Sequence, residues 1–162
     1  MEQEVLQALG IALLLGLLVG LQREWDKHPL AGIRTFTLIT LFGAISAVLA
    51  RDFGGFIIAA SLIAVAGLLM TGNWMAENGD EDSSSGQTTE IAALLMFAVG
   101  ALATTGHTIP AVVLAGTTAV LLHIKERLHS AIGLLSVTDT RAIFQFVLIA
   151  MVILPLLPNQ TF

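Results

Sequence analysis

The chain has 162 residues, of which 56% are hydrophobic and only 12% charged, and its formal net charge is −5 at pH 7. A soluble domain carries roughly a quarter charged residues, so this composition excludes a water-covered globular surface and indicates a protein embedded in the lipid bilayer. The seven Lys and Arg residues are spread over separate loops, which excludes a nucleic-acid partner. Cysteine is absent, so disulfides, thiolate metal sites and cysteine nucleophiles are excluded too.

Charged residues divide the chain into apolar stretches of membrane-spanning length. A spanning helix needs about 20 mostly apolar residues. The longest uncharged stretch, 91–124, exceeds one span, and Pro110 favours a break there because proline lacks an amide donor and restricts the residue before it. We therefore expect an all-α integral membrane bundle of about six transmembrane helices, at 5–22, 33–50, 55–75, 89–105, 110–128 and 137–154.

A polar and acidic segment separates two groups of these helices. Residues 77–88 are rich in Glu, Asp, Ser and Gly, a composition typical of a flexible linker. We therefore expect two three-helix membrane halves, 1–76 and 89–162, joined by this linker.

Basic residues predict the orientation of the chain. They gather in two loops, at 23–34 and 125–141, whereas the loop between the second and third helices contains only Arg51. Loops rich in Lys and Arg remain in the cytoplasm. We therefore expect a multi-pass protein of the bacterial inner membrane with its basic loops cytoplasmic and both termini outside. The acidic N-terminus is unlike a secretory signal, so the first helix is expected to be retained.

The first predicted hairpin carries most of the interpretable chemistry. Arg23 and Glu24 end the first helix and Arg34 opens the second, so we expect them to be neighbours, with Glu24 paired to Arg34 or to Lys27. One interpretation is an interfacial anchor, with Trp25 in the aromatic belt. The other is that these charges line the cytoplasmic mouth of a polar path or bind an anionic headgroup.

A similar hairpin lies near the C-terminus. Lys125, Glu126 and Arg127 end the fifth predicted helix, and Asp139 and Arg141 begin the sixth. An internal repeat would produce this likeness, and so would the positive-inside rule by itself. In the site interpretation, Glu126 and Arg141 join the polar path.

Small residues in the first helix predict close helix packing. Gly16 and Gly20 form a GxxxG motif, and such motifs let helix backbones approach one another in lipid. The partner helix belongs either to the same chain or to a second copy. We expect a homodimer through these small-residue faces.

Polar groups inside the predicted spans have a default structural explanation. Threonine and serine in membrane helices mostly bond to their own backbone, so Thr37, Thr40 and Ser46 are expected to serve packing, with a hydrophilic pathway as the alternative. His107 is expected in an exposed turn and lacks partners at a metal-ligand spacing. No nucleophile elbow, phosphate loop or zinc motif appears, so we expect neither an enzyme nor a cofactor.

Two motifs at a fixed separation resemble a known family. Residues 17–24 read Leu-Leu-Val-Gly-Leu-Gln-Arg-Glu, and residues 31–35 read Ala-Gly-Ile-Arg-Thr. This pair is similar to the MgtC/SapB family, in which a glycine-rich first helix ends in a Gly-x-x-Arg/Glu pattern and the second opens with Ala-Gly-Leu-Arg-Thr. The later stretches 88–94, 125–129, 141–142 and 154–159 resemble the longer members of the family. In those members an MgtC/SapB-like N-terminal half leads into a second hydrophobic domain.

The resemblance implies a multi-pass inner-membrane protein linked to magnesium limitation, acid stress or virulence. It implies functional or structural key roles for the positions that match the motifs, namely Arg23, Glu24, Gly32, Arg34 and Thr35. The leading hypothesis is transport or handling of a small ion such as Mg²⁺. The alternative is a non-transporting regulator that binds another membrane protein under magnesium or acid stress.

Overall fold

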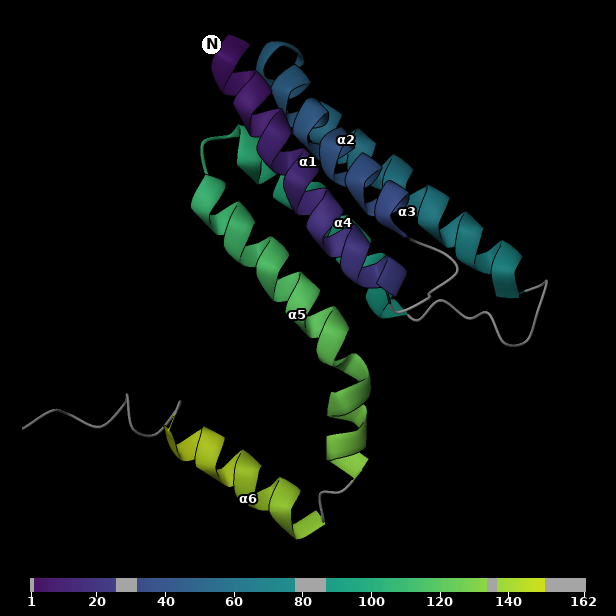
Figure 1. Cartoon of the computed structure of the whole chain (residues 1–162), viewed down its shortest axis with the longest axis vertical. Helices are drawn as coiled ribbons and strands as arrows, with labels where there is room; N and C mark the ends of the chain where they lie inside the picture. Colours follow the sequence, from purple (N-terminus) through teal and green to yellow (C-terminus); the bar gives the residue numbers. More distant parts are fainter. Residues whose placement is uncertain (1, 26–31, 78–86, 134–136, 151–162) are drawn as a thin grey trace, which may run out of the picture. The chain divides into compact units, whose positions relative to one another are not determined.

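The structure is a computed structural model that describes residues 2–25, 32–77, 87–133 and 137–150. Figure 1 shows the chain as a succession of helices. They are α1 (Glu2–Trp25), α2 (Ile33–Phe53), α3 (Phe56–Glu77), α4 (Gln87–Thr104), α5 (Thr108–Gly133) and α6 (Val137–Leu148). The predicted all-α membrane bundle is confirmed: within the described ranges, α1 to α4 each contain a stretch long and apolar enough to cross a membrane. In α5 the apolar part, Thr108–Ile124, is shorter.

Several helices extend beyond the predicted bounds for physical reasons. The first helix begins at Glu2, because its early acids, Glu2 and Glu4, suit the positive end of a helix dipole. The fifth begins at Thr108, before Pro110, because proline is tolerated in a first turn whose amides have no helical partner. The predicted end of the sixth helix, at 154, lies outside the described residues.

Helix α2 lies at the centre of the described bundle and contacts α1, α3 and α4. Its Phe36 is fully buried, and its Phe42 packs edge-on against Phe97 of α4, with ring centroids 5.9 Å apart. Buried apolar side chains from α1, α2, α4 and α5 form one core, which includes Leu15, Val19, Phe36, Met96, Val99, Ala115 and Leu122.

Glycines set the distance between α2 and the helices on either side of it. A Cβ at Gly16 would lie 2.7 Å from the Thr37 Cα, and one at Gly20 would lie 2.6 Å from the Ile33 Cα. The GxxxG motif therefore packs α1 against α2 of the same chain. The predicted homodimer stays a prediction, and this motif gives it no separate support.

The contact between α2 and α4 is equally close. A Cβ at Gly43 of α2 would overlap the Phe97 carbonyl oxygen, and one at Gly100 of α4 would overlap the Thr40 carbonyl oxygen. Backbone therefore meets backbone on both sides of α2, which is how small residues drive helix association in lipid.

The chain forms two compact units, residues 1–123 and 124–162, so the division falls within α5. The linker predicted at 77–88 stays a prediction, because most of that segment lies outside the described residues. Helix α4, which follows the segment, packs against α1 and α2 of the first unit. The glycine contacts explain this grouping, because they join α4 to α2 whatever the polarity of the segment between them.

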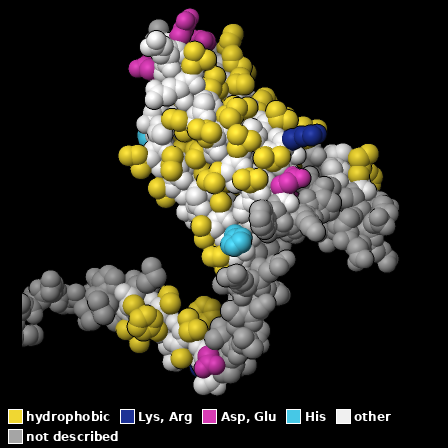
Figure 2. Space-filling model, in the orientation of Figure 1, with side chains coloured by type: hydrophobic (Ala, Val, Ile, Leu, Met, Phe, Trp, Pro, Cys, Tyr) yellow, Lys and Arg dark blue, Asp and Glu magenta, His cyan; other side chains and the backbone are white. Residues whose placement is uncertain are grey.

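The surface of the first unit suits lipid. Figure 2 shows hydrophobic side chains spread over its visible face, several acidic groups at one end, and one acidic and one basic group toward the other end. Helix α3 is the most exposed of the candidate spans, with Ile63 and Leu68 71% and 75% accessible. These side chains contact the bilayer core in a membrane protein.

Candidate functional site

The α1–α2 hairpin is joined at its ends by Glu24. This carboxylate, at the end of α1, accepts a hydrogen bond of 3.3 Å from the backbone N–H of Ile33, the first residue of α2. The N-cap of α2 is Gly32, which has no side chain to cap the helix. Glu24 therefore supplies from α1 the acceptor and the negative charge that a helix N-terminus favours.

Gly32 leaves room for that carboxylate. A Cβ at this position would overlap the Glu24 Oε2 atom, so any larger residue would displace the acid from the helix end. The glycine of the Ala-Gly-Ile-Arg-Thr motif is thus explained by a close approach between a side chain and the backbone.

Beside this contact lies a cavity of about 440 Å³, lined by Glu24, Gly32, Ile33, Arg34 and Thr35. The hairpin thus brings together four of the residues that the sequence analysis singled out. Arg34 is exposed, and in the described part of the chain neither a hydrogen bond nor an ion pair joins it to Glu24. The expected alternative partner, Lys27, lies outside the described residues.

Arg23 has a different environment from its neighbour Glu24. It is 2% exposed, and its Nη2 donates a hydrogen bond of 2.7 Å to the Thr89 Oγ1 atom of α4. It therefore joins α1 to α4 instead of lining the hairpin cavity. Thr89 was not predicted as part of the site, because no sequence pattern relates two positions 66 residues apart.

The second predicted hairpin was expected to contribute Glu126 and Arg141 to the polar path. The side chain of Glu126 lies outside the described residues. Arg141 is exposed on α6, in the second unit. Their part in a shared site with the first hairpin stays a prediction.

Hydroxyl groups within the spans bond to their own helices, as expected. Thr37, Thr40 and Ser46 donate to the carbonyls four residues earlier, at distances of 2.6 to 2.7 Å. Thr118 of α5 does the same. These hydroxyl hydrogens are therefore satisfied within the bundle.

Comparison with known proteins places the chain in a family. The family model of the MgtC family matches residues 9–131, a range that begins in α1 and ends near the end of α5. Neither the comparison with curated proteins nor the comparison with solved structures gave a match. Because the family match covers well over half of the sequence, the chain belongs to the MgtC family.

Proposed function

We propose that this MgtC family protein is a non-transporting membrane regulator, and that its hairpin cavity binds an acidic group of another membrane protein. One observation carries the proposal. The exposed Arg34 lines a cavity at the positive end of α2, and the carboxylate in that lining, Glu24, is hydrogen bonded to the helix end. The predicted orientation places this cavity at the cytoplasmic face.

The charges of the cavity favour an anionic ligand. Glu24 offsets the partial positive charge of the α2 N-terminus, which amounts to roughly half an elementary charge, and part of the Arg34 charge. The remaining balance is positive and lies at the exposed guanidinium. A guanidinium binds a carboxylate through two parallel hydrogen bonds, so Arg34 suits an Asp or Glu side chain of a partner.

Mg²⁺ transport through the same hairpin has less physical support. The path expected from the sequence needs the charges of Arg23 and Glu24, yet Arg23 is buried against Thr89 and Glu24 holds the start of α2. A divalent cation in the cavity would also meet the like charge of Arg34. The contacts of Arg23 and Glu24 favour a structural role in which they hold the helices together and leave the Arg34 guanidinium exposed.

Cross-linking at the cavity tests the proposed partner. A photo-reactive amino acid in place of Thr35 should give one protein adduct of discrete mass in native membranes. Arg34→Gln should remove at least about nine-tenths of this adduct, because the charge-assisted bond is lost. Arg34→Lys should keep much of it, because the charge remains.

Three results would contradict the proposal. Equal adduct yields in all three chains would show that the contact does not depend on Arg34. Loss of the adduct in Arg34→Lys would show that the positive charge at this position is not what binds the partner. If the only adduct had the mass of a lipid, the cavity would bind a lipid headgroup and not a protein partner. Far-UV circular dichroism of each variant establishes that the bundle is folded.

A further inference from the structure

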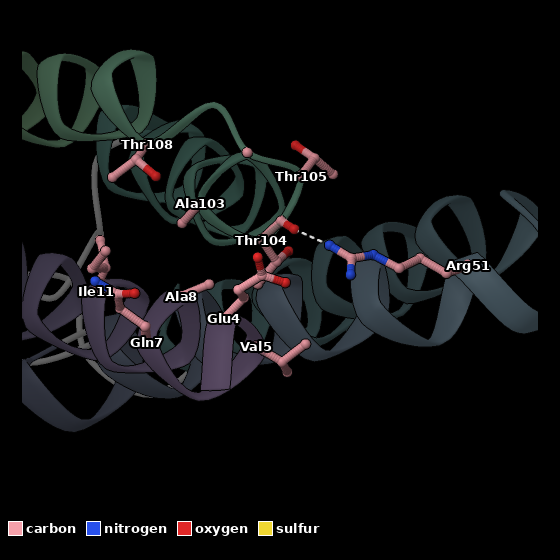
Figure 3. Close-up of a pocket in the computed structure, with 11 residues that line it drawn as sticks. Glu4, Val5, Gln7, Ala8, Ile11, Arg51, Ala103, Thr104, Thr105 and Thr108 are labelled. Atoms are coloured by element: carbon pink, nitrogen blue, oxygen red, sulfur yellow. Dashed lines mark hydrogen bonds between the residues drawn. The ribbon is translucent and has the colours of Figure 1, made fainter. Parts of the chain in front are cut away.

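A second polar cavity lies where α1 begins, α2 ends, and α4 turns into α5. It has a volume of about 540 Å³, within the size range of small-molecule sites. Figure 3 shows residues from all four helices around it. Its polar lining comprises Glu4, Gln7, Arg51, Thr104, Thr105 and Thr108.

Two opposite charges face this cavity from different helices. Arg51, near the end of α2, donates a hydrogen bond to the backbone carbonyl of Thr104, the last residue of α4. This bond holds the guanidinium in place and occupies one of its several N–H donors. Glu4, from the first turn of α1, directs its carboxylate toward Thr104 from another side (Figure 3).

The other lining residues complete a site with a polar part and an apolar part. The Thr108 hydroxyl and the Gln7 amide offer further donors and acceptors. The Thr105 hydroxyl donates its hydrogen to the Leu102 carbonyl and offers an acceptor to the cavity. Val5 and Ile11 of α1 supply apolar wall. The lining residues lie at or near the ends of the candidate spans, at the level where lipid headgroups contact a membrane protein.

We propose that this cavity binds an aminoethyl phosphate group, with the phosphate at Arg51 and the primary ammonium at Glu4. A guanidinium matches phosphate oxygens with paired donors. A primary ammonium has three N–H donors for the Glu4 carboxylate and neighbouring oxygens. The opposite charges of the lining match a zwitterion better than a simple anion or cation. The group belongs either to a phosphatidylethanolamine lipid or to free phosphoethanolamine.

Native mass spectrometry of the purified full chain tests this pairing with three lipids of identical acyl chains. Phosphatidylethanolamine should bind about tenfold more tightly than phosphatidylcholine, which keeps both charges but lacks the ammonium N–H donors. Its affinity should exceed that of phosphatidylglycerol by a similar factor, because phosphatidylglycerol has the phosphate but lacks the ammonium group. Equal retention of the three lipids would overturn the proposal, unless free phosphoethanolamine binds as described below.

Matched variants locate the site. Glu4→Gln and Arg51→Gln should each weaken phosphatidylethanolamine binding about tenfold. Glu2→Gln removes the same charge from the same turn of α1, at a position that does not line the cavity, and should leave binding unchanged. Unchanged binding in Glu4→Gln would overturn the proposal. That variant decides the matter if Arg51→Gln fails to fold.

Soluble ligands distinguish the two sources of the group. Free phosphoethanolamine should bind the wild-type chain and lose affinity in Glu4→Gln, whereas inorganic phosphate should bind much more weakly because it lacks the ammonium. Binding of the free compound without preferential lipid retention would assign the site to a soluble ligand. Failure of both phosphatidylethanolamine and phosphoethanolamine would refute the proposal.

Discussion

Gly100→Ala should destabilise the bundle by about 3 kcal/mol or more, at the upper end of what overpacking costs. The added Cβ would overlap the carbonyl oxygen of Thr40, which is backbone and has no rotamer by which to move aside. The two helices would have to separate, which would loosen the edge-on contact of the buried Phe97 ring with Phe42. Unfolding in mixed micelles of rising dodecyl sulfate content, followed by far-UV circular dichroism, measures the loss.

Gly67→Ala is the matched control for this substitution. Gly67 also lies inside a candidate span, in α3, but a Cβ there would meet no atom within 4 Å. Alanine is favoured over glycine inside a helix by about 0.5–1 kcal/mol, so this variant should be neutral or slightly more stable. Equal destabilisation by the two substitutions would show that the close approach of α2 and α4 is not the cause.

Thr89→Val should lower the free energy of unfolding by about 2 kcal/mol, within the range of roughly 1.5–3 kcal/mol for losing a hydrogen bond to a charged group. The substitution keeps the shape of the side chain and removes the hydroxyl that accepts from Arg23, whose side chain is 2% exposed. Breaking one contact of a buried charge is costlier than breaking an exposed pair. Thr88→Val, at an exposed position of the same helix turn, should change the stability by less than about 0.5 kcal/mol.

A double-mutant cycle shows whether these two residues act together. In the Arg23→Met background, Thr89→Val should cost little, so the coupling energy should be about 1–2 kcal/mol. Additive effects would mean that the hydroxyl contributes to stability without Arg23. The same denaturation in mixed micelles gives all four stabilities.

The fold was largely predictable because one physical constraint dominates it. Apolar stretches of spanning length must be helical in lipid, so the existence of each helix follows from the spacing of charges. The helix neighbours did not follow from that spacing. Gly43 and Gly100 are ordinary glycines in the sequence, and only the structure shows that each faces a backbone carbonyl of the other helix.

The candidate site was predictable where it is local. A hairpin must bring the end of α1 to the start of α2, so Glu24, Gly32 and Arg34 had to lie close together. The expected ion pair between Glu24 and Arg34 does not form in the described part of the chain. The backbone N–H of Ile33, which has no partner within its own helix, donates a hydrogen bond to the Glu24 carboxylate instead.

The burial of Arg23 and the second cavity depend on contacts between distant segments. An arginine next to a glutamate at a helix end resembles an interfacial anchor, and its partner Thr89 follows only from the position of α4. No sequence pattern relates Glu4 to Arg51. The antiparallel hairpin nevertheless places the first turn of α1 beside the last turn of α2.

Ion flux through the purified protein distinguishes a regulator from a transporter. The purified chain would be reconstituted in liposomes that contain a Mg²⁺ dye and a pH dye, with Glu24→Ala prepared in parallel and the folding of both established by circular dichroism. A regulator whose hairpin charges hold α1, α2 and α4 together should give the same Mg²⁺ and proton entry as protein-free vesicles, in both chains. Mg²⁺ entry through the wild-type chain that disappears in Glu24→Ala would contradict this account and make the hairpin the mouth of a transport path.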